Sequence, residues 1–338
     1  MILFIQEIYL GEIKIVNSIK YSIIIPIYET DLNFLKQCIE SAVNQKSIFD
    51  FEILLINDGS KNLLIDELCY EYSKKYKNIR YFFNANNGVS FSRNFGVSNA
   101  SGEFLIFLDA DDILVDQCLM EIDKCINNDE NVDLIRFGNV IIDYKSKIIK
   151  NNNFLDSRRF QSGVVWGKVF RKKTISDNCI KFNESLKLCE DSIFLNEFCK
   201  FKNGTIDIFL NLYQYRFNKR STIRNFNLNN HINVNNAVAE LLKYNDNLSV
   251  YEFAVYSYVN LVLKRNFFHK SHKIKNRVKI ASDILNSTDY IFLKSLNVVL
   301  DSKKNNFTFY LAKLLKNNRF RLAIIFLDVY KKIKKIYN

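Results

Sequence analysis

The stretch Phe104-Leu105-Ile106-Phe107-Leu108-Asp109-Ala110-Asp111-Asp112 decides the fold of this chain. Its unbroken apolar run predicts a strand buried on both faces, as in the centre of a parallel sheet. Three carboxylates then follow within four residues, at the edge where open α/β sheets bind their ligands. Clustered aspartates are hard oxygen ligands suited to Mg²⁺ or Mn²⁺, and these metals commonly accompany phosphate.

A second apolar segment upstream repeats this pattern. Residues 51–56 are predicted to form a buried strand that runs into Asn57-Asp58-Gly59-Ser60. Gly59 permits a tight turn close to a ligand, and Asp58 is a candidate acceptor of a hydrogen bond from a base or a sugar. An ordinary turn with Ser60 as a helix cap explains the same residues equally well. Together, the two acid-tipped strands predict one site for a metal-bound, phosphate-bearing ligand.

A third candidate segment is Asn86-Asn87-Gly88-Val89-Ser90-Phe91-Ser92-Arg93-Asn94-Phe95-Gly96. A glycine turn into a helix leaves N–H groups and a positive dipole end available to an anion. Arg93 adds a cation to this position. A capped helix with a surface arginine is the simpler explanation of the segment taken by itself.

Strands alternate with helices over the first 140 residues, which predicts an α/β fold with a mostly parallel, doubly wound sheet. Expected strands cover residues 21–27, 51–56, 79–83, 103–108 and 132–137, with helices between them, and residues 140–149 are expected to form a hairpin. We expect a lead segment at 1–20 and one domain at 21–225, divided into halves at 21–112 and 113–225. A helical region is expected at 226–338.

Size and charge limit the possible classes of protein. The chain has 338 residues, 48% of them apolar, which is enough for a sizeable core. The net charge is +12, and residues 302–338 contribute ten basic side chains and one acid. A basic tail indicates a polyanionic neighbour, either nucleic acid or an anionic membrane surface. An apolar stripe along residues 319–338 predicts an interfacial helix on anionic lipid, or a terminal helix packed on the domain.

Cysteine usage and hydropathy predict a cytoplasmic protein. The seven cysteines form no CxxC pair and there are three histidines, so a zinc site has little support and free thiols are expected. No signal peptide is evident, and no run approaches the ~18 apolar residues of a membrane span. Together with the basic tail, these features predict a cytoplasmic location, with peripheral binding to the inner face of the cell membrane as a further option.

Six short motifs follow one another in a fixed order over about ninety residues. They are Ile25-Pro26-Ile27-Tyr28, Ser41-Ala42-Val43-Asn44-Gln45, Asp58-Gly59-Ser60, Asn86-Asn87-Gly88, Arg93-Asn94-Phe95-Gly96 and Asp109-Ala110-Asp111. This ordered set resembles the family 2 glycosyltransferases of GT-A fold that assemble bacterial surface polysaccharides. Three later segments resemble the same family more loosely: Trp166-Gly167-Lys168, Glu190-Asp191-Ser192-Ile193-Phe194 and Tyr213-Gln214-Tyr215-Arg216.

The resemblance implies a metal-dependent, inverting enzyme that moves a hexosyl or N-acetylhexosaminyl group from a UDP-sugar to a hydroxyl of a glycan or lipid-linked glycan. It implies Asp191 as the general base and Asp111, assisted by Asp109, as the ligands of Mg²⁺ or Mn²⁺. The implied donor-binding residues are Pro26, Tyr28, Asp58, Asn87, Gly88, Arg93, Asp109 and Arg216. Asp58 is expected at the uracil edge, and Arg216 or Lys219 over the diphosphate. A solvated cation on the surface explains either basic residue nearly as well.

Two other classes explain part of the pattern. A nucleotidyltransferase shares the sheet and the metal chemistry, although no glycine-rich phosphate signature lies near residues 21–30. A basic nucleic-acid-binding or membrane-binding protein explains the charge but leaves the acid clusters at two strand ends unexplained. The sequence does not favour a redox Rossmann enzyme, because no GxGxxG motif follows any predicted strand. We expect no nucleic-acid partner.

Overall fold

The computed structural model describes residues 19–126, 131–151, 163–186, 188–217, 236–242, 290–301 and 307–317, and the single positions 251, 255, 319, 322, 323 and 326. Most of the lead segment, Lys219, the boundary expected near residue 225 and most of the basic tail lie outside the described residues.

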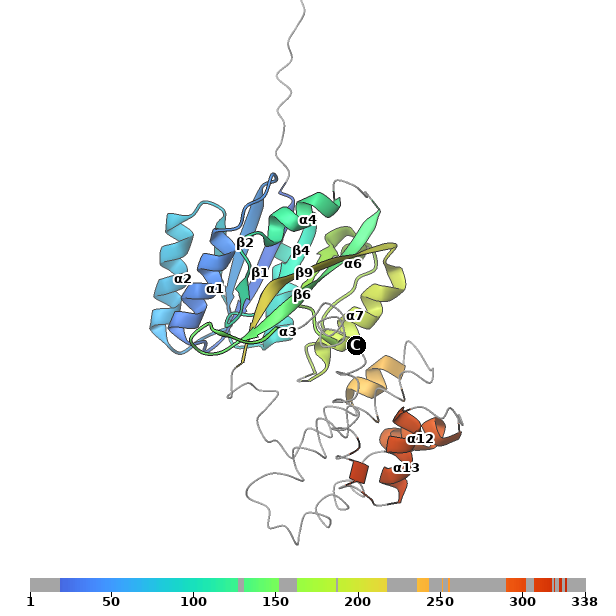
Figure 1. Cartoon of the computed structure of the whole chain (residues 1–338). Coiled ribbons are helices and arrows are strands. Elements are labelled where there is room, and N and C mark those ends of the chain that lie inside the picture. The colour runs from blue at the N-terminus through green and yellow to red at the C-terminus, as the bar shows by residue number, and fades with distance from the viewer. Residues whose placement is uncertain are drawn as a thin grey trace, which may run out of the picture.

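The described helices and strands alternate as the sequence predicts for its first half (Figure 1). They are β1 (Tyr21–Ile27), α1 (Leu32–Val43), β2 (Phe51–Asn57), α2 (Leu63–Lys75), β3 (Ile79–Phe83), α3 (Val89–Asn99), β4 (Phe104–Phe107), β5 (Ile113–Leu114), α4 (Cys118–Ile126), β6 (Val132–Ile142), β7 (Ile148–Asn151), β8 (Lys168–Arg171), α6 (Lys172–Asp177), α7 (Glu190–Phe201), β9 (Gly204–Arg216), α12 (Tyr290–Asp301) and α13 (Phe307–Lys316).

The strands form one sheet in the order β3-β2-β1-β4-β8-β6-β9-β5, with β7 paired to β6. The first four run parallel, as expected. The strand expected at residues 132–137 is confirmed as the first part of β6, which runs in the same direction as β4. The sequence did not predict β8, which lies between β4 and β6 and runs antiparallel to both. The hairpin expected at residues 140–149 is confirmed by the antiparallel pairing of β6 with β7.

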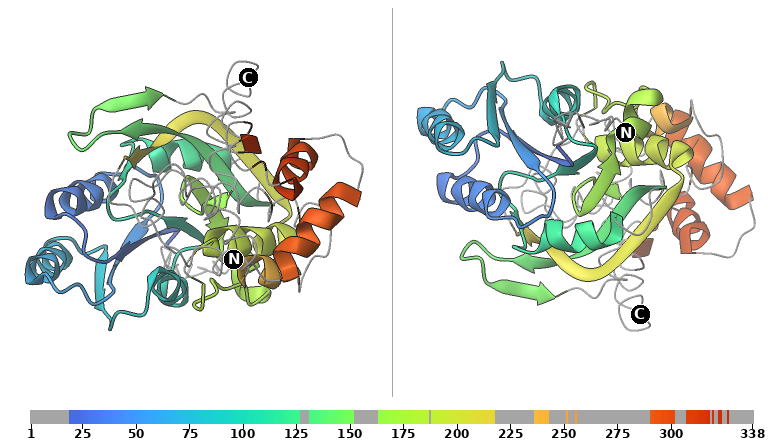
Figure 2. Two further views of the ribbon diagram at one scale, coloured as in Figure 1. Left: turned by 90° about the horizontal axis from the view of Figure 1, so that it is seen from below. Right: turned by 90° about the horizontal axis from the view of Figure 1, so that it is seen from above.

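Helices cover both faces of the sheet, and the views from below and above agree on this arrangement (Figure 2). Alternate residues of each parallel strand point to opposite faces, so the sheet supports two buried clusters. On one face Ile23 and Ile53 pack with apolar residues of α1, α2 and α4. On the other face Ile24 and Leu54 pack with apolar residues of α6 and α7, while α3 also contacts β1 and β2 there.

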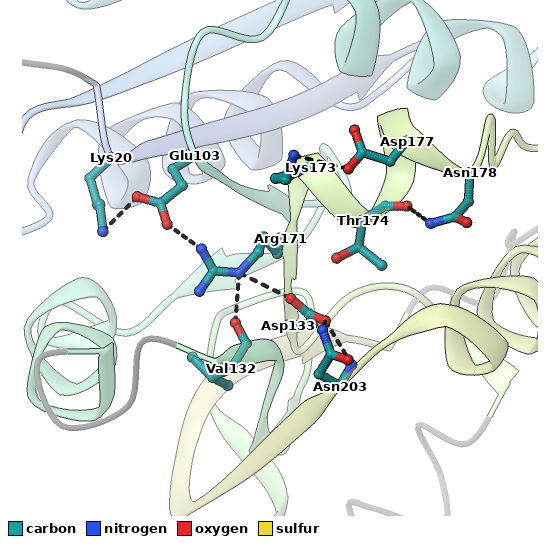
Figure 3. A network of polar contacts seen from close by, with 10 residues as sticks. All are labelled: Lys20, Glu103, Val132, Asp133, Arg171, Lys173, Thr174, Asp177, Asn178 and Asn203. Atoms are coloured by element: carbon teal, nitrogen blue, oxygen red, sulfur yellow. Dashed lines mark hydrogen bonds and ion pairs between the residues drawn. The ribbon is translucent and has the colours of Figure 1, made fainter.

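A network at the amino end of β4 joins the two halves of the sheet (Figure 3). Arg171, at the end of β8, pairs with Glu103 and with Asp133 of β6, the latter at 3.0 Å between Nε and Oδ1. Its Nε also donates to the carbonyl of Val132 at 2.9 Å. Lys20 pairs with the other oxygen of Glu103 at 2.6 Å. This network lies away from the carboxyl ends of the strands.

The described parts of the carboxyl-terminal region are helical, as the sequence predicts. Residues 236–242 form helical turns, and α12 and α13 pack against each other (Figure 1). Among the helices that the structure describes, none is long and apolar enough to cross a bilayer. All seven cysteines are free thiols.

We expect Gly96→Val to lower the free energy of unfolding by about 1–3 kcal/mol, because it overpacks a filled interface. A Cβ atom at Gly96 would lie 2.5 Å from Cγ2 of Ile24 and 2.9 Å from Cδ1 of Ile56. The measurement is urea unfolding of the two proteins. Ser98→Val is the matched control, since it adds the same side chain on the exposed side of α3. Equal losses in both variants would contradict the packing explanation.

Candidate functional site

A cavity of about 1470 Å³ opens at the carboxyl ends of the parallel strands. The register aligns Ile27 at the end of β1 with Asn57 at the end of β2, and the amide of Leu108 donates to the carbonyl of Ile24. These pairings bring three strand ends to one edge, as the sequence predicts. Seven of the predicted site residues line this cavity: Pro26, Tyr28, Asp58, Asn87, Gly88, Asp109 and Asp111.

Asp58 fixes the loop that leads into α3. Its Oδ1 accepts a hydrogen bond from the amide of Asn87 at 3.0 Å, and its Oδ2 accepts one from Gly88 at 2.7 Å. Gly88 has φ of 96°, a conformation that disfavours side chains. The buried Asp58 carboxylate therefore holds the loop between β3 and α3 in place on the cavity wall.

Arg93 joins the acid cluster to α7. Its guanidinium is buried and lies 3.1 Å from Oδ1 of Asp109, 2.7 Å from Oδ1 of Asp191 and 3.5 Å from Oε1 of Glu190. Burial would lower the pKa of this guanidinium, but the three carboxylates, Asp191 above all, outweigh burial and raise the pKa. Two carboxylates that are 82 positions apart in the sequence, Asp109 and Asp191, thus share one cation.

Asp191 lies in the first turn of α7, after Cys189 in a left-handed conformation with φ of 66°. Burial raises the pKa of the Asp191 carboxyl to about 7, against the opposing effect of the Arg93 charge. The amide of Val165 donates to its Oδ2 at 3.3 Å. Behind that amide, Nζ of the buried Lys168 donates to the carbonyl of Val164 at 2.7 Å. Burial lowers the pKa of Lys168 to about 7.

The three aspartates after β4 have different surroundings. Asp112 is fully buried and accepts hydrogen bonds from the hydroxyl of Tyr213 and the amide of Arg216, each at 2.7 Å. Burial raises the pKa of the Asp112 carboxyl well above its usual value, and the neighbouring Asp111 and Asp109 add to the increase. Asp109 and Asp111, by contrast, line the cavity.

The two cavity carboxylates fit a hard divalent cation, but within the described part of the chain no group of three or more His, Cys, Asp or Glu side chains is arranged to hold one.

The structure places Arg216 differently from the expected position over a diphosphate. This side chain is 1% exposed, and its guanidinium donates hydrogen bonds to protein atoms. It does not line the cavity. The expectation of direct contact with a ligand is therefore corrected, because the guanidinium is enclosed beneath residues 109–112, which we call the acid loop.

Sequence reasoning missed several residues of this site. Glu190 was not predicted as a site residue, although its motif was recognised, and the structure shows that it contacts Arg93. Tyr213 stacks on the indole of Trp166 with ring centres 4.8 Å apart and bonds to Asp112. Tyr144, at the turn after β6, lines the cavity and is 66% exposed. The first two lie inside motifs already quoted, whereas nothing in the sequence marks Tyr144.

The parallel half with acid-tipped strands, joined through an antiparallel strand to a second half, defines the GT-A fold. Residues 22–167 match the family model described as Glycosyl transferase family 2, and the chain carries a domain of that family. Its structure aligns with the crystal structure of S. aureus TarS 1-349 in complex with UDP at a TM-score of 0.64. That alignment covers 93% of this chain and 92% of the other at 17% identity, a likeness that shows the fold.

Sequence relatives carry glycan-related names. The minor teichoic acid biosynthesis protein GgaA of Bacillus subtilis (strain 168) is 32% identical over 197 residues, which are 52% of this chain and 42% of that protein. Glycosyltransferase GlyA of Streptococcus pneumoniae serotype 4 (strain ATCC BAA-334 / TIGR4) is 26% identical over 225 residues, 61% of this chain and 32% of that protein. The chain thus matches less than half the length of either relative.

Proposed function

We propose that this protein is an inverting glycosyltransferase that transfers a hexosyl or N-acetylhexosaminyl group from a UDP-sugar to an acceptor hydroxyl. The observation that carries the proposal is the cavity lined by six of the eight predicted donor-site residues, with Arg93 linking its acid cluster to Asp191. The names of the relatives support sugar transfer. TarS structures in complex with UDP and with UDP-GlcNAc support a uridine nucleotide as the donor.

The nucleotide is assigned to the wall formed by β1, β2 and α3. Tyr28 is 46% exposed in the cavity, so its ring is available to stack on a base. Asp58, which already orders the Asn87–Gly88 loop, has lone pairs left for the uracil edge. Pro26, Asn87 and Gly88 complete this wall.

Asp109 and Asp111 are assigned to Mg²⁺ or Mn²⁺ together with the donor diphosphate. A divalent cation bound there would neutralise the negative charge that develops on the leaving diphosphate. Asp109 also meets Arg93, whose buried guanidinium keeps this carboxylate and Asp191 at fixed positions. The protein thereby holds donor and base in a defined relation before reaction.

Asp191 is assigned as the general base. It takes the proton of the acceptor hydroxyl while the hydroxyl oxygen attacks the anomeric carbon and the diphosphate leaves from the opposite side. A single displacement inverts the anomeric configuration. The α7 dipole favours the ionised carboxylate at this position.

The acceptor is proposed to be a glycan or lipid-linked glycan, in line with the relative named for teichoic acid biosynthesis. This acceptor class fits a cytoplasmic protein that binds the inner face of the cell membrane peripherally through its basic tail. Bacterial polysaccharide or glycoconjugate assembly is the proposed setting.

A binding and product assay tests the proposal. Calorimetric titration with UDP and with UDP-sugars, in the presence and absence of MnCl₂, should give metal-dependent binding. Sugar transfer should release UDP, whereas a nucleotidyltransferase would release pyrophosphate. Absence of heat with every uridine nucleotide in the presence of Mn²⁺ would reject the proposed function.

Turnover should fall as pH drops through about 7, because the base acts in its ionised form and burial raises the pKa of Asp191 to about 7. The measurement is kcat at saturating donor and acceptor between about pH 5.5 and pH 8.5. Glu190→Gln is the informative control, since it removes a like charge that raises the pKa of Asp191. The ascending limb should then move to lower pH, and an unchanged limb would contradict the assignment.

A further inference from the structure

Arg216 ends β9 at the point where the acid loop, α1 and the β6–β7 turn meet. Its Nε donates to the carbonyl of Asp111 at 2.8 Å, and its Nη2 donates to Oε1 of Gln37 on α1 at 2.7 Å. Its Nη1 donates to the carbonyl of Asp143 and to the hydroxyl of Ser146, both at 3.1 Å. One side chain therefore connects three segments of the protein.

The arrangement around Arg216 is closed and specific. The four acceptors of its guanidinium are neutral atoms, and its Cζ lies over the ring of Phe34 at 4.3 Å from the ring centre. The hydroxyl of Ser146 also donates to Oε1 of Gln37 at 2.8 Å, which closes a small ring of hydrogen bonds. A buried charge without a carboxylate acceptor is expensive, and the nearby charges of Asp112 and Asp111 offset part of that cost.

The Arg216 guanidinium lies beside the acid loop. The backbone amide of Arg216 donates to Asp112, and Nε holds the carbonyl of Asp111. The Asp111 side chain itself lines the cavity. Arg216 thus sets the backbone from which the cavity carboxylate projects, and its charge offsets the repulsion within the aspartate cluster.

We infer that Arg216 is a positioning residue for metal-dependent donor binding: through the Asp111 carbonyl it orients the carboxylate that meets the cation and the diphosphate, without touching either. This inference rests on the proposed function. It assigns Gln37 a share of the same role, because Gln37 fixes the direction of the guanidinium. Residues that hydrogen-bond to a metal-binding segment and orient its ligand commonly change metal affinity by about 10- to 100-fold when they are mutated.

The test is calorimetric titration of UDP in the presence of MnCl₂ into wild-type protein and into Arg216→Met, Arg216→Lys and Gln37→Met. We expect the Kd of Arg216→Met to rise by about 10- to 100-fold, with a smaller rise for the other two variants. Binding stoichiometry should stay near that of wild type. A structural defect alone would instead reduce the stoichiometry and leave the Kd of the folded fraction unchanged.

Arg171→Met is the matched control, because Arg171 also bridges several segments but lies at the opposite end of β4 (Figure 3). It should lower thermal stability without changing the Kd for UDP. If circular dichroism shows that the Arg216 variants are unfolded, Gln37→Met carries the test. The inference would be overturned if wild type binds UDP and the Kd of Gln37→Met and of every folded Arg216 variant lies within about twofold of the wild-type Kd. A change of that size is well below the expected range. Lack of binding by wild type would instead reject the proposed function.

Discussion

Asp191→Asn is expected to reduce kcat by about 10³-fold while the Kd for UDP with Mn²⁺ changes little. Asparagine preserves the shape of the side chain and keeps one of its two oxygens, which accepts from either Arg93 or the Val165 amide, since these two donors reach different oxygens of Asp191. It has no basic carboxylate, however, so the acceptor proton has no recipient. Steady-state release of UDP in the presence of acceptor gives kcat, and titration calorimetry gives the Kd.

Asp111→Ala provides the contrast for this prediction. It removes a proposed metal ligand on the cavity wall, so both donor binding and turnover should fall. Glu190→Gln, a change of the same kind at the neighbouring acid, should retain most of the turnover near pH 8. An Asp191→Asn protein that keeps more than about a tenth of wild-type kcat would remove Asp191 from the role of base, since general base catalysis contributes at least about a hundredfold.

Arg93→Met is expected to lower the free energy of unfolding by about 3–5 kcal/mol at pH 8, which is the cost of leaving buried carboxylates without their counter-ion. Three carboxylates depend on this guanidinium. The loss should shrink toward pH 5, because Arg93 opposes the rise in the pKa of Asp191 and its removal lets that carboxylate take up a proton more readily. Urea unfolding at both pH values measures the effect.

Arg136→Met is the control for Arg93. Arg136 makes two hydrogen bonds to Asp207 at 2.7 and 2.9 Å, but its side chain is 26% exposed. Solvent screens such a pair, so the expected loss is about 1 kcal/mol or less. Equal losses for the two arginines, or a loss at Arg93 that does not depend on pH, would contradict the buried-cluster explanation.

The sequence predicted the half of the fold with parallel strands closely because its signals are local. Apolar runs and helical spacing located β1 to β4 with their helices, and β1 and β3 have the predicted bounds. The meeting of Asp58 and Asp109 at one cavity follows from the rule that parallel strands end at a common edge. These features depend on short segments and on sheet geometry.

The remainder depends on long-range contacts that no local pattern encodes. The β8 strand has four residues, which are too few for a sequence pattern to predict that it lies between β4 and β6. Arg216 was predicted at a ligand because its motif resembles one of the family, yet its partners on α1 and the β6–β7 turn lie up to 179 positions away. The joint contact of Arg93 with Asp109 and Asp191 likewise requires the assembled fold.

The family match ends before the strands that complete the sheet, and β8 is the first of these strands. The family match stops at residue 167, one residue before the strand that shields the open side of β4. A truncated protein that ends at this homology limit would present the backbone of β4 as an unpaired edge, which invites aggregation. The smallest fragment worth expressing therefore extends through Arg216, where β9 completes the pairing of β6 and β5.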